Sequence, residues 1–231
     1  MTKKIILAWS GGKDSALALR ELGKSKEYEV VCLLCTITSD FMRVSMHGVR
    51  SELINIQAEH LGKPLEKVLI SKDGDNSEYE SRMSEVLSRY KNAGIQAVAF
   101  GDIFLEDVRK YREDHLAQMG MKAVFPLWGR DTTRLANEFI DNGFEAVVTC
   151  VDSHYLGKEF VGRIFNRQFL ADLPSGVDDC GENGEFHTFV YRAPFFLEKI
   201  ENRLGDIVYR ESRFYYCDVM NIPKMTRPLI K

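Results

Sequence analysis

The feature that most constrains the fold is the N-terminal segment KKIILAWSGGKDSALALREL, residues 3–22. Residues 5–9 form an apolar run of strand length, which stops just before the glycine pair Gly11 and Gly12. Leucine and alanine then recur at helical spacing over residues 14–22, which predicts a helix. A strand, a glycine turn and a helix N-terminus in this order predict an anion site, because the first helical N–H groups lack acceptors within the helix.

The length of the loop SGGKDS indicates which phosphates of a nucleotide it binds. No Walker loop, GxxxxGK[ST], follows a predicted strand. The shorter loop resembles the pyrophosphatase loop of enzymes that cleave ATP between the α and β phosphates and attach AMP to a carbonyl oxygen. We therefore expect ATP as the nucleotide, with the Lys13 ammonium as a catalytic group at the β and γ phosphate oxygens. The predicted ATP contacts in this loop are Ser10, Gly11, Gly12, Lys13, Asp14 and Ser15.

Composition sets the class of protein. The chain has 231 residues, 45% hydrophobic and 28% charged, as in ordinary globular proteins. Its net charge of −3 provides no overall attraction to nucleic acid or to an anionic membrane. There is no apolar run of membrane-spanning length and no apolar signal segment, so we expect a cytoplasmic protein. Five cysteines, an odd number, favour free thiols.

Strand and helix patterns alternate through the first half of the chain, which predicts an α/β fold with a parallel sheet of the HUP or Rossmann type. We expect this ATP-binding domain at residues 1–129 and a smaller α+β, substrate-binding domain at residues 130–231. The expected strands are residues 5–9, 29–36, 65–70, 97–100, 123–125, 145–151 and a β-like stretch at 208–219, with a turn at 202–205. The expected helices are residues 14–22, 49–61, 77–93, 105–119, 132–142 and 158–170, with residues 37–47 as a loop.

Three polar segments follow predicted strands, at residues 10–15, 36–47 and 101–106. Ligands of open parallel sheets bind beyond the carboxyl ends of the strands, so we expect these segments to converge on one ligand. Thr36, Gly101 and Asp102 are further predicted nucleotide contacts, and Asp102 is the predicted ligand of Mg²⁺ bridging the phosphates. His47 and Glu106 are the predicted substrate contacts of this region.

The second unusual segment is GENGEFHT, residues 181–188, which combines carboxylates, an imidazole and a hydroxyl on a loop with two glycines. The alternative to a functional site is a solvated acidic turn before a strand. As a site, its carboxylates could hold an ammonium-like nucleophile or take its proton. Because a glycine precedes it and a strand follows, we expect Glu185 to be held more firmly than Glu182. The predicted catalytic residues here are Glu185, His187 and, as the weaker candidate, Glu182; Gly184 and Thr188 are predicted to contact substrate.

Together these segments resemble the diphthine–ammonia ligase family. The matching motifs, in order, are SGGKDS, Gly101-Asp102-Ile103, Pro126-Leu127-Trp128, GENGEFHT and Ala193-Pro194-Phe195-Phe196. The resemblance implies that a carboxylate, diphthine on elongation factor 2, is adenylated and then converted to its amide by ammonia. The family pattern near EGGEYET is changed here at Asn183, Phe186 and His187, so another carboxylate stays open as the acceptor. Homodimerisation is also left open.

Two other functions share this ATP loop. An RNA-modifying enzyme would need a basic RNA-binding face and a reactive cysteine pair, for which Cys32 and Cys35 are the candidates. Both cysteines lie on one predicted strand, where positions three apart point to opposite faces, so we expect core packing instead. The other alternative is a binding module that holds AMP or ATP without releasing pyrophosphate.

Overall fold

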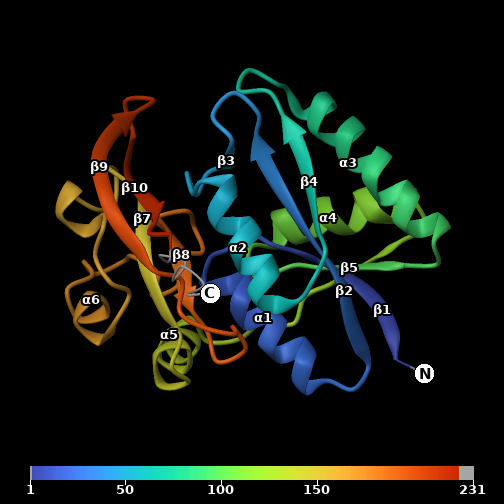
Figure 1. The fold of residues 1–231 in the computed structure, drawn as a ribbon, viewed down its shortest axis with the longest axis horizontal. Helices are drawn as coiled ribbons and strands as arrows, with labels where there is room; N and C mark the ends of the chain where they lie inside the picture. The colour runs from blue at the N-terminus through green and yellow to red at the C-terminus, as the bar shows by residue number, and fades with distance from the viewer. Residues whose placement is uncertain (1, 224–231) are drawn as a thin grey trace, which may run out of the picture.

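Strand β1 (Lys3–Ala8) and helix α1 (Lys13–Lys24) form the expected strand–loop–helix unit at the middle of the larger sheet. The computed structural model describes residues 2–223 (Figure 1). Sheet A has the order β3-β2-β1-β5-β6, with β4 paired to β2, and all its pairs are parallel except β2–β3. Its remaining strands are β2 (Tyr28–Thr38), β3 (Arg43–Val44), β4 (Leu65–Ile70), β5 (Ala97–Ala99) and β6 (Lys122–Val124).

The order of the parallel strands reverses at β1. The chain moves outward from β1 through β2 to β4, and then returns to add β5 on the other side of β1. The crevice at such a reversal is where open α/β sheets bind ligands. The SGGKDS loop follows β1 and Gly101-Asp102 follows β5, so the topology brings both motifs to this crevice.

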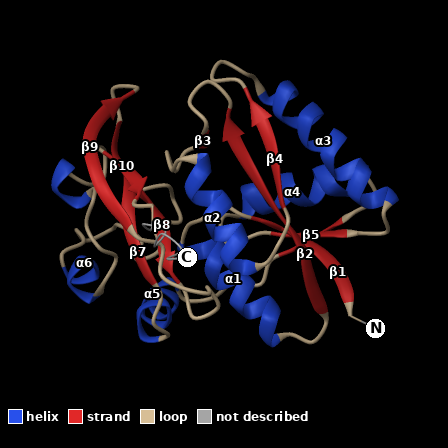
Figure 2. Cartoon of the chain, in the orientation of Figure 1, coloured by secondary structure: helices blue, strands red, loops and turns tan. Residues whose placement is uncertain are grey.

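Helices cover both faces of sheet A (Figure 2). The two apolar clusters show the arrangement: α1 and α2 (Ser51–Leu61) share one cluster, and α3 (Asn76–Asn92) and α4 (Glu106–Gln118) share the other. Cys35 lies in the first cluster and Cys32 in the second, which confirms that these cysteines point to opposite faces and pack in the core. Within residues 2–223, no helix has both the length and the apolar character to cross a membrane.

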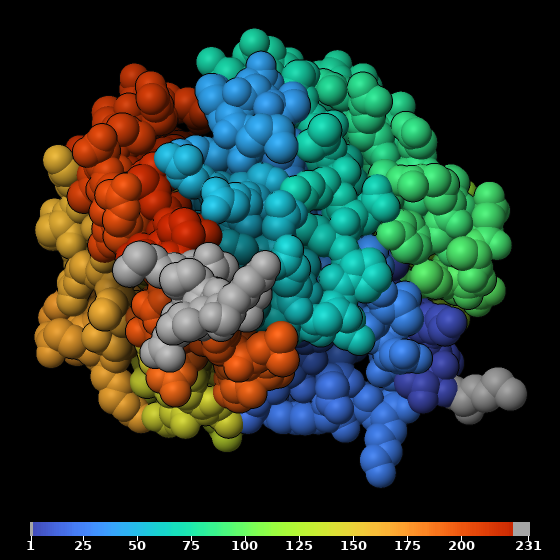
Figure 3. All heavy atoms as spheres, in the orientation of Figure 1, coloured from blue at the N-terminus to red at the C-terminus, as the bar shows by residue number. Residues whose placement is uncertain are grey.

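The second half of the chain builds sheet B, an antiparallel sheet with the order β8-β7-β10-β9. Helices α1 and α2 lie between the two sheets (Figure 1), and the apolar cluster of their face continues into sheet B. The two parts of the chain pack directly on each other, as the space-filling view shows (Figure 3). The elements are α5 (Thr132–Asp141), β7 (Glu145–Asp152), the 3₁₀ turn η1 (Lys158–Phe160), α6 (Arg167–Ala171), β8 (Phe186–Arg192), β9 (Asn202–Arg210) and β10 (Phe214–Asn221).

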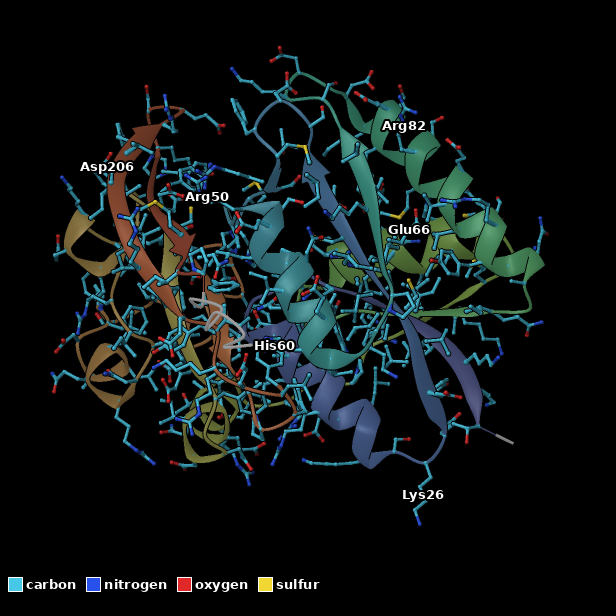
Figure 4. All side chains as sticks on the ribbon, viewed as in Figure 1. Lys26, Arg50, His60, Glu66, Arg82 and Asp206 are labelled. Atoms are coloured by element: carbon cyan, nitrogen blue, oxygen red, sulfur yellow. The ribbon has the colours of Figure 1, made fainter. Side chains whose placement is uncertain are left out.

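An ion-pair cluster joins the segment before α2 to β10. Asp218 of β10 accepts from Arg50 at 2.9 and 2.6 Å and pairs with Arg43 at 2.9 Å. Figure 4 labels Arg50 at the start of α2, on the side that faces sheet B. Gly48 lies against the Tyr216 ring, where a Cβ atom would come within 2.6 Å of Cδ1. These contacts hold the segment that carries His47 against the second half of the chain.

Three expectations about secondary structure are wrong. The expected helix at 158–170 is split, because Gly162 has φ +82° and residues 162–165 bond to β7 instead. Residues 202–205 are the start of β9; the hairpin turns at Glu211 and Ser212, which have positive φ values. Residues 37–47 are not wholly a loop, since β2 continues to Thr38 and β3 pairs with it.

Candidate functional site

A cleft of about 620 Å³ opens at the carboxyl ends of β1, β2, β4 and β5. It is the place that the topology predicts for a ligand. The structure brings nine of the expected site residues to its lining: Ser10, Asp14, Ser15, Thr36, His47, Gly101, Asp102, Glu182 and His187. Seven others lie outside the lining: Gly11, Gly12, Lys13, Glu106, Gly184, Glu185 and Thr188. Glu106 is exposed at the start of α4.

The loop between β1 and α1 is fixed by Gln57 of α2, a residue that the sequence analysis missed. Gln57 is fully buried. Its Nε2 donates to the carbonyls of Gly11 and Val190 at 3.0 and 2.6 Å, and its Oε1 accepts from Trp9 Nε1 at 2.8 Å. Gly11 has φ +78°, and a Cβ there would meet Ile54 at 2.5 Å. One amide thus joins α2, the loop and β8.

The N-terminus of α1 is capped from the other half of the chain. Thr188 Oγ1 accepts the Lys13 N–H at 3.0 Å, while Gly12 at the N-cap position supplies no side chain. Gly101 approaches so closely that a Cβ on it would lie 2.9 Å from the Asp14 carbonyl carbon and 3.1 Å from the Ser15 nitrogen. The first helical turn, with the partial positive charge of the helix dipole, therefore faces the cleft beside the end of β5.

The Lys13 side chain is buried and does not line the cleft. It is 2% exposed, and its ammonium donates to the Cys180 carbonyl and to Asp14 Oδ2, the latter at 3.1 Å. It also lies 5.0 Å from the centre of the Phe186 ring. Burial is the largest influence and lowers the pKa of Lys13, but the interactions with Asp14, Cys180 and Glu182 together outweigh it, so the pKa is raised overall. Its donors are directed at protein acceptors here, and the contact with phosphate oxygens expected of Lys13 stays a prediction.

Glu182 is the carboxylate that the GENGEFHT loop presents to the cleft. Its Oε1 accepts the Ile103 N–H at 2.6 Å and the Phe104 N–H at 3.3 Å. Burial raises the pKa of Glu182 to about 7, and the nearby charge of Asp14 acts in the same direction. A carboxyl with a pKa near neutrality can hold or release a proton at physiological pH, which suits acid–base work.

Glu185 has a different environment from the one expected. It is fully buried, and its Oε1 accepts from the Asp178 N–H at 3.0 Å and from Asn183 Nδ2 at 2.9 Å. Its other oxygen has no partner among the described residues. Gly184 turns the chain here with φ +87°. Glu185 lies inside the loop and Glu182 lines the cleft, so the position favours Glu182 as the group facing a ligand, and the catalytic role expected of Glu185 stays a prediction.

Two imidazoles line the cleft side by side. The rings of His47 and His187 have centroids 4.5 Å apart, and His47 Nδ1 lies 3.3 Å from the Thr188 carbonyl oxygen. Burial lowers the pKa of His47 to about 4 and that of His187 well below its usual value. Both rings are therefore neutral near pH 7 and can accept or donate hydrogen bonds to a ligand.

Acidic oxygens in the cleft bear on the expected magnesium site. Asp14 Oδ1 is buried and accepts no hydrogen bond from the described residues. Asp102 Oδ1 accepts from Arg112 Nη2 at 3.1 Å, and Asp102 Oδ2 forms an ion pair with Arg112 Nε at 2.7 Å but accepts no hydrogen bond from the described residues. No group of three metal-ligating side chains occurs within residues 2–223. Mg²⁺ usually binds through one or two carboxylates together with substrate phosphates. The donors present fit an ion shared with a nucleotide, with Asp14 as the available protein oxygen.

The deep end of the cleft is more apolar, and sequence reasoning missed it. Arg112 lies over the Phe100 ring at 4.4 Å, and His115 Nε2 is buried without a partner among residues 2–223. The apolar and aromatic residues around them are Leu34, Ile70, Tyr79, Met83, Leu87, Val98, Phe100 and Leu116. Apolar and aromatic walls with a few polar groups are typical of sites for small molecules and cofactors. The available signal was the helical spacing of Met83, Leu87, Arg112 and Leu116 on α3 and α4.

Comparisons with known proteins agree with the family resemblance. A family model described as the diphthamide synthase N-terminal domain matches residues 3–123, and one described as the diphthamide synthase C-terminal domain matches residues 131–224. These two matches account for most of the chain.

Similar curated proteins bear one name, diphthine–ammonia ligase. The protein of Danio rerio is 28% identical over 245 residues, covering 94% of this chain and 93% of that protein. The protein of Schizosaccharomyces pombe is 25% identical over 238 residues, and the match covers 89% of this chain but only 38% of that longer protein. The protein of Rattus norvegicus is 32% identical over 116 residues, 46% of this chain.

Proposed function

Because the chain belongs to the diphthamide synthase family, a family of enzymes, we propose that it is an ATP-dependent ligase that converts a carboxylate to its amide with ammonia. The carboxylate oxygen attacks the α phosphate of ATP and pyrophosphate leaves. Ammonia then attacks the acyl-adenylate, AMP leaves, and one proton is released. The name shared by the relatives supports diphthine as the acceptor, and the family resemblance supports elongation factor 2 as the protein that carries it.

The observation that carries the proposal is the convergence, in one cleft, of a helix N-terminus and the raised-pKa carboxyl of Glu182. The first turn of α1 and the hydroxyls of Ser10 and Ser15 face the cleft, where they would hold the phosphates. Fixed N–H donors at a helix N-terminus stabilise the charge that develops on the departing pyrophosphate. The apolar end of the same cleft would hold the adenine ring.

The acceptor half of the reaction would take place beside Glu182 and the two imidazoles. Near pH 7 about half of the Glu182 side chains are ionised, so Glu182 could hold an ammonium ion and take its proton. His47 and His187 stay neutral and would orient the acceptor by hydrogen bonds. The backbone N–H groups of Ile103 and Phe104 hold the Glu182 carboxyl in place during these steps.

When bound with ATP, Mg²⁺ would neutralise phosphate charge and polarise the α phosphate. Asp14 is the residue that would hold it from the protein side, through the buried Oδ1. We propose Asp102 as an indirect contributor, since its pair with Arg112 already satisfies part of its charge. We propose that the protein acts in the cytoplasm. Its five cysteines are all free and buried.

The two alternative functions, an RNA-modifying enzyme and a nucleotide-binding module without turnover, gain no specific support. Burial raises the pKa of Cys35 to about 12 and also raises that of Cys32, which makes both poor nucleophiles at neutral pH. A thiolating RNA enzyme would need at least one reactive thiolate. A nucleotide-binding module without turnover shares the cleft, and the assay below distinguishes it.

The test is the product pair. The protein is incubated with ATP, Mg²⁺, ammonium and a diphthine-bearing elongation factor 2 or a small carboxylate, and nucleotides are separated by chromatography. We expect AMP and pyrophosphate in equal amounts, with amide formed only when ammonium is present. ADP with phosphate would exclude the pyrophosphatase mechanism. Tight ATP binding without pyrophosphate release over hours, with every acceptor, would identify a binding module.

A further inference from the structure

The Lys13 side chain has donors that the proposed reaction leaves unused. The residue is 2% exposed and does not line the cleft, and its ammonium donates to the carbonyl of Cys180, the residue just before the GENGEFHT loop. Asp14 Oδ2 is its second acceptor, at 3.1 Å. The rings of Phe186 and Phe165 lie 5.0 and 5.8 Å from it, at distances where aromatic faces attract cations.

The loop that Lys13 contacts is held both by hydrogen bonds of its own and by bonds to other segments, because Cys180 Sγ donates to the Thr132 carbonyl and the Ile103 N–H donates to Glu182. Asp178 accepts the N–H groups of Cys180 and Glu182 at 3.0 Å each, and Glu185 accepts the Asp178 N–H. Cys180 lies only two residues before Glu182. The Lys13 ammonium therefore connects the first turn of α1 to the backbone that orients the cleft carboxylate.

We propose that Lys13 is a positioning residue that holds Glu182 in the cleft through the Cys180 carbonyl, and that it does not bind phosphate. The main-chain N–H of Lys13 joins the same two parts of the chain through Thr188. Moving the ammonium into the cleft would cost its contacts to the Cys180 carbonyl, Asp14 Oδ2 and the Phe186 ring, and a buried ammonium that loses its partners is destabilised. The inference rests on the proposed function only in assigning Glu182 to the reaction.

The first test is hydrogen exchange in the free protein. Lys13→Met fills the same apolar space beside Phe186 and removes the donors. We expect exchange at the amides of Glu182 and Ile103 to become at least tenfold faster, because local opening controls it. The matched control is Lys24→Met at the exposed end of the same helix, where both amides should exchange as in the wild type. Unchanged exchange in Lys13→Met would refute positioning.

The second test compares nucleotides by calorimetry. Without a phosphate contact from Lys13, Lys13→Met should change the affinities for ATP and AMP by the same factor, within about threefold. A loss confined to ATP would assign Lys13 to the β and γ phosphates and overturn the proposal.

A third readout separates positioning from a general loss of stability. The ionisation of Glu182 can be followed with ¹³C-labelled glutamate in the free protein. Because burial is the largest cause of the raised pKa of Glu182, a loop that opens in Lys13→Met should expose the carboxyl and move the midpoint downward from the wild-type value. A lower melting temperature with an unchanged midpoint would mean that Lys13 only stabilises the fold.

The wild-type protein provides a test that needs no variant to fold. Lysines are acetylated with acetic anhydride, and the products are read by mass spectrometry. We expect Lys13 to react at least tenfold more slowly than Lys24, with or without ATP, because only local opening exposes it. Rapid modification that ATP prevents would overturn the proposal. Exchange, ionisation and acetylation require no turnover, so they decide the role of Lys13 even if no amide is formed.

Discussion

Thr188 Oγ1 of β8 accepts the Lys13 N–H of α1 at 3.0 Å, so the helix that faces the nucleotide cleft is capped from 175 residues further along the chain. In most helices the cap comes from the residue just before the first turn. Here that residue is Gly12. A Cβ atom on Gly12 would lie 2.9 Å from the Thr188 carbonyl oxygen, so the glycine leaves room for this close approach. The second half of the chain thus completes the anion site of the first.

Thr188→Val should remove this cap while keeping the shape of the side chain. We expect the free energy of unfolding to fall by about 1–2 kcal/mol, the range for loss of a helix cap. Urea unfolding followed by circular dichroism measures the change. Thr133→Val, at an exposed position in α5, is the control and should stay within about 0.5 kcal/mol of the wild type.

The sequence predicted the cleft well because the argument needed only strand ends. Once the periodicity places strands before Ser10 and Gly101, parallel topology brings these positions together without knowledge of side-chain contacts. The alternation of side chains along a strand likewise placed Cys32 and Cys35 correctly on opposite faces of the sheet. The helix expected at 158–170 failed because the apolar spacing was right but Gly162 turns the backbone, and pairing with β7 outweighs local preference.

Side-chain directions were the part that sequence could not settle. Glu182 and Glu185 are three residues apart in one irregular loop, and hydrogen bonds from Asp178 and Asn183 decide which one enters the cleft. The direction of the Lys13 side chain likewise depends on a distant contact, the carbonyl of Cys180, which is 167 residues away in the sequence. Gln57 did leave a signal: it is a polar residue on the apolar face of the helix expected at 49–61, and buried amides must find partners.

Gly101→Ala should disturb the contact between β5 and α1. The new Cβ would lie 2.9 Å from the Asp14 carbonyl carbon, and this backbone cannot move aside without shifting the first turn. We expect a loss of about 1–3 kcal/mol in unfolding free energy, with at least tenfold weaker ATP binding by calorimetry. Gly23→Ala is the matched control, because its Cβ would meet nothing within 4 Å, and it should stabilise α1 by about 0.5–1 kcal/mol.

Glu182→Gln should separate the two halves of the reaction. The amide keeps the size of the side chain and an acceptor for the Ile103 N–H, but it cannot take a proton. We expect ATP affinity within about threefold of the wild type and amide formation reduced about 10²-fold, the scale of a lost acid–base group. Both are measured on one preparation. Glu113→Gln, on the exposed side of α4, controls for loss of a carboxylate; equal turnover in the two variants would contradict the assignment.

The pH dependence of turnover should follow Glu182. Its pKa is raised to about 7, and only the ionised form can accept a proton, so kcat should rise with pH through about pH 7. Initial rates at saturating ATP between pH 5.5 and 8.5 provide the profile, and Glu182→Gln should flatten this limb. A limb that persists unchanged in Glu182→Gln would assign the titration to another group.

The pH dependence of stability should reveal His47. Its pKa is about 4 in the folded protein against an ordinary value of 6.5, so between these values the unfolded chain binds more protons. The contribution of the neutral His47 ring to the free energy of unfolding is therefore fully present above pH 6.5 and is lost as the pH falls toward 4. His47→Gln removes this titration, and its loss of unfolding free energy from pH 7 to pH 5 should be smaller than that of the wild type by about 2 kcal/mol. Urea unfolding at both values measures it.

Between pH 7 and pH 8 the two proteins should change in parallel, because His47 is neutral there in both states. An equal acid loss in both would mean that the His47 ring is protonated in the folded protein and is not held neutral beside His187.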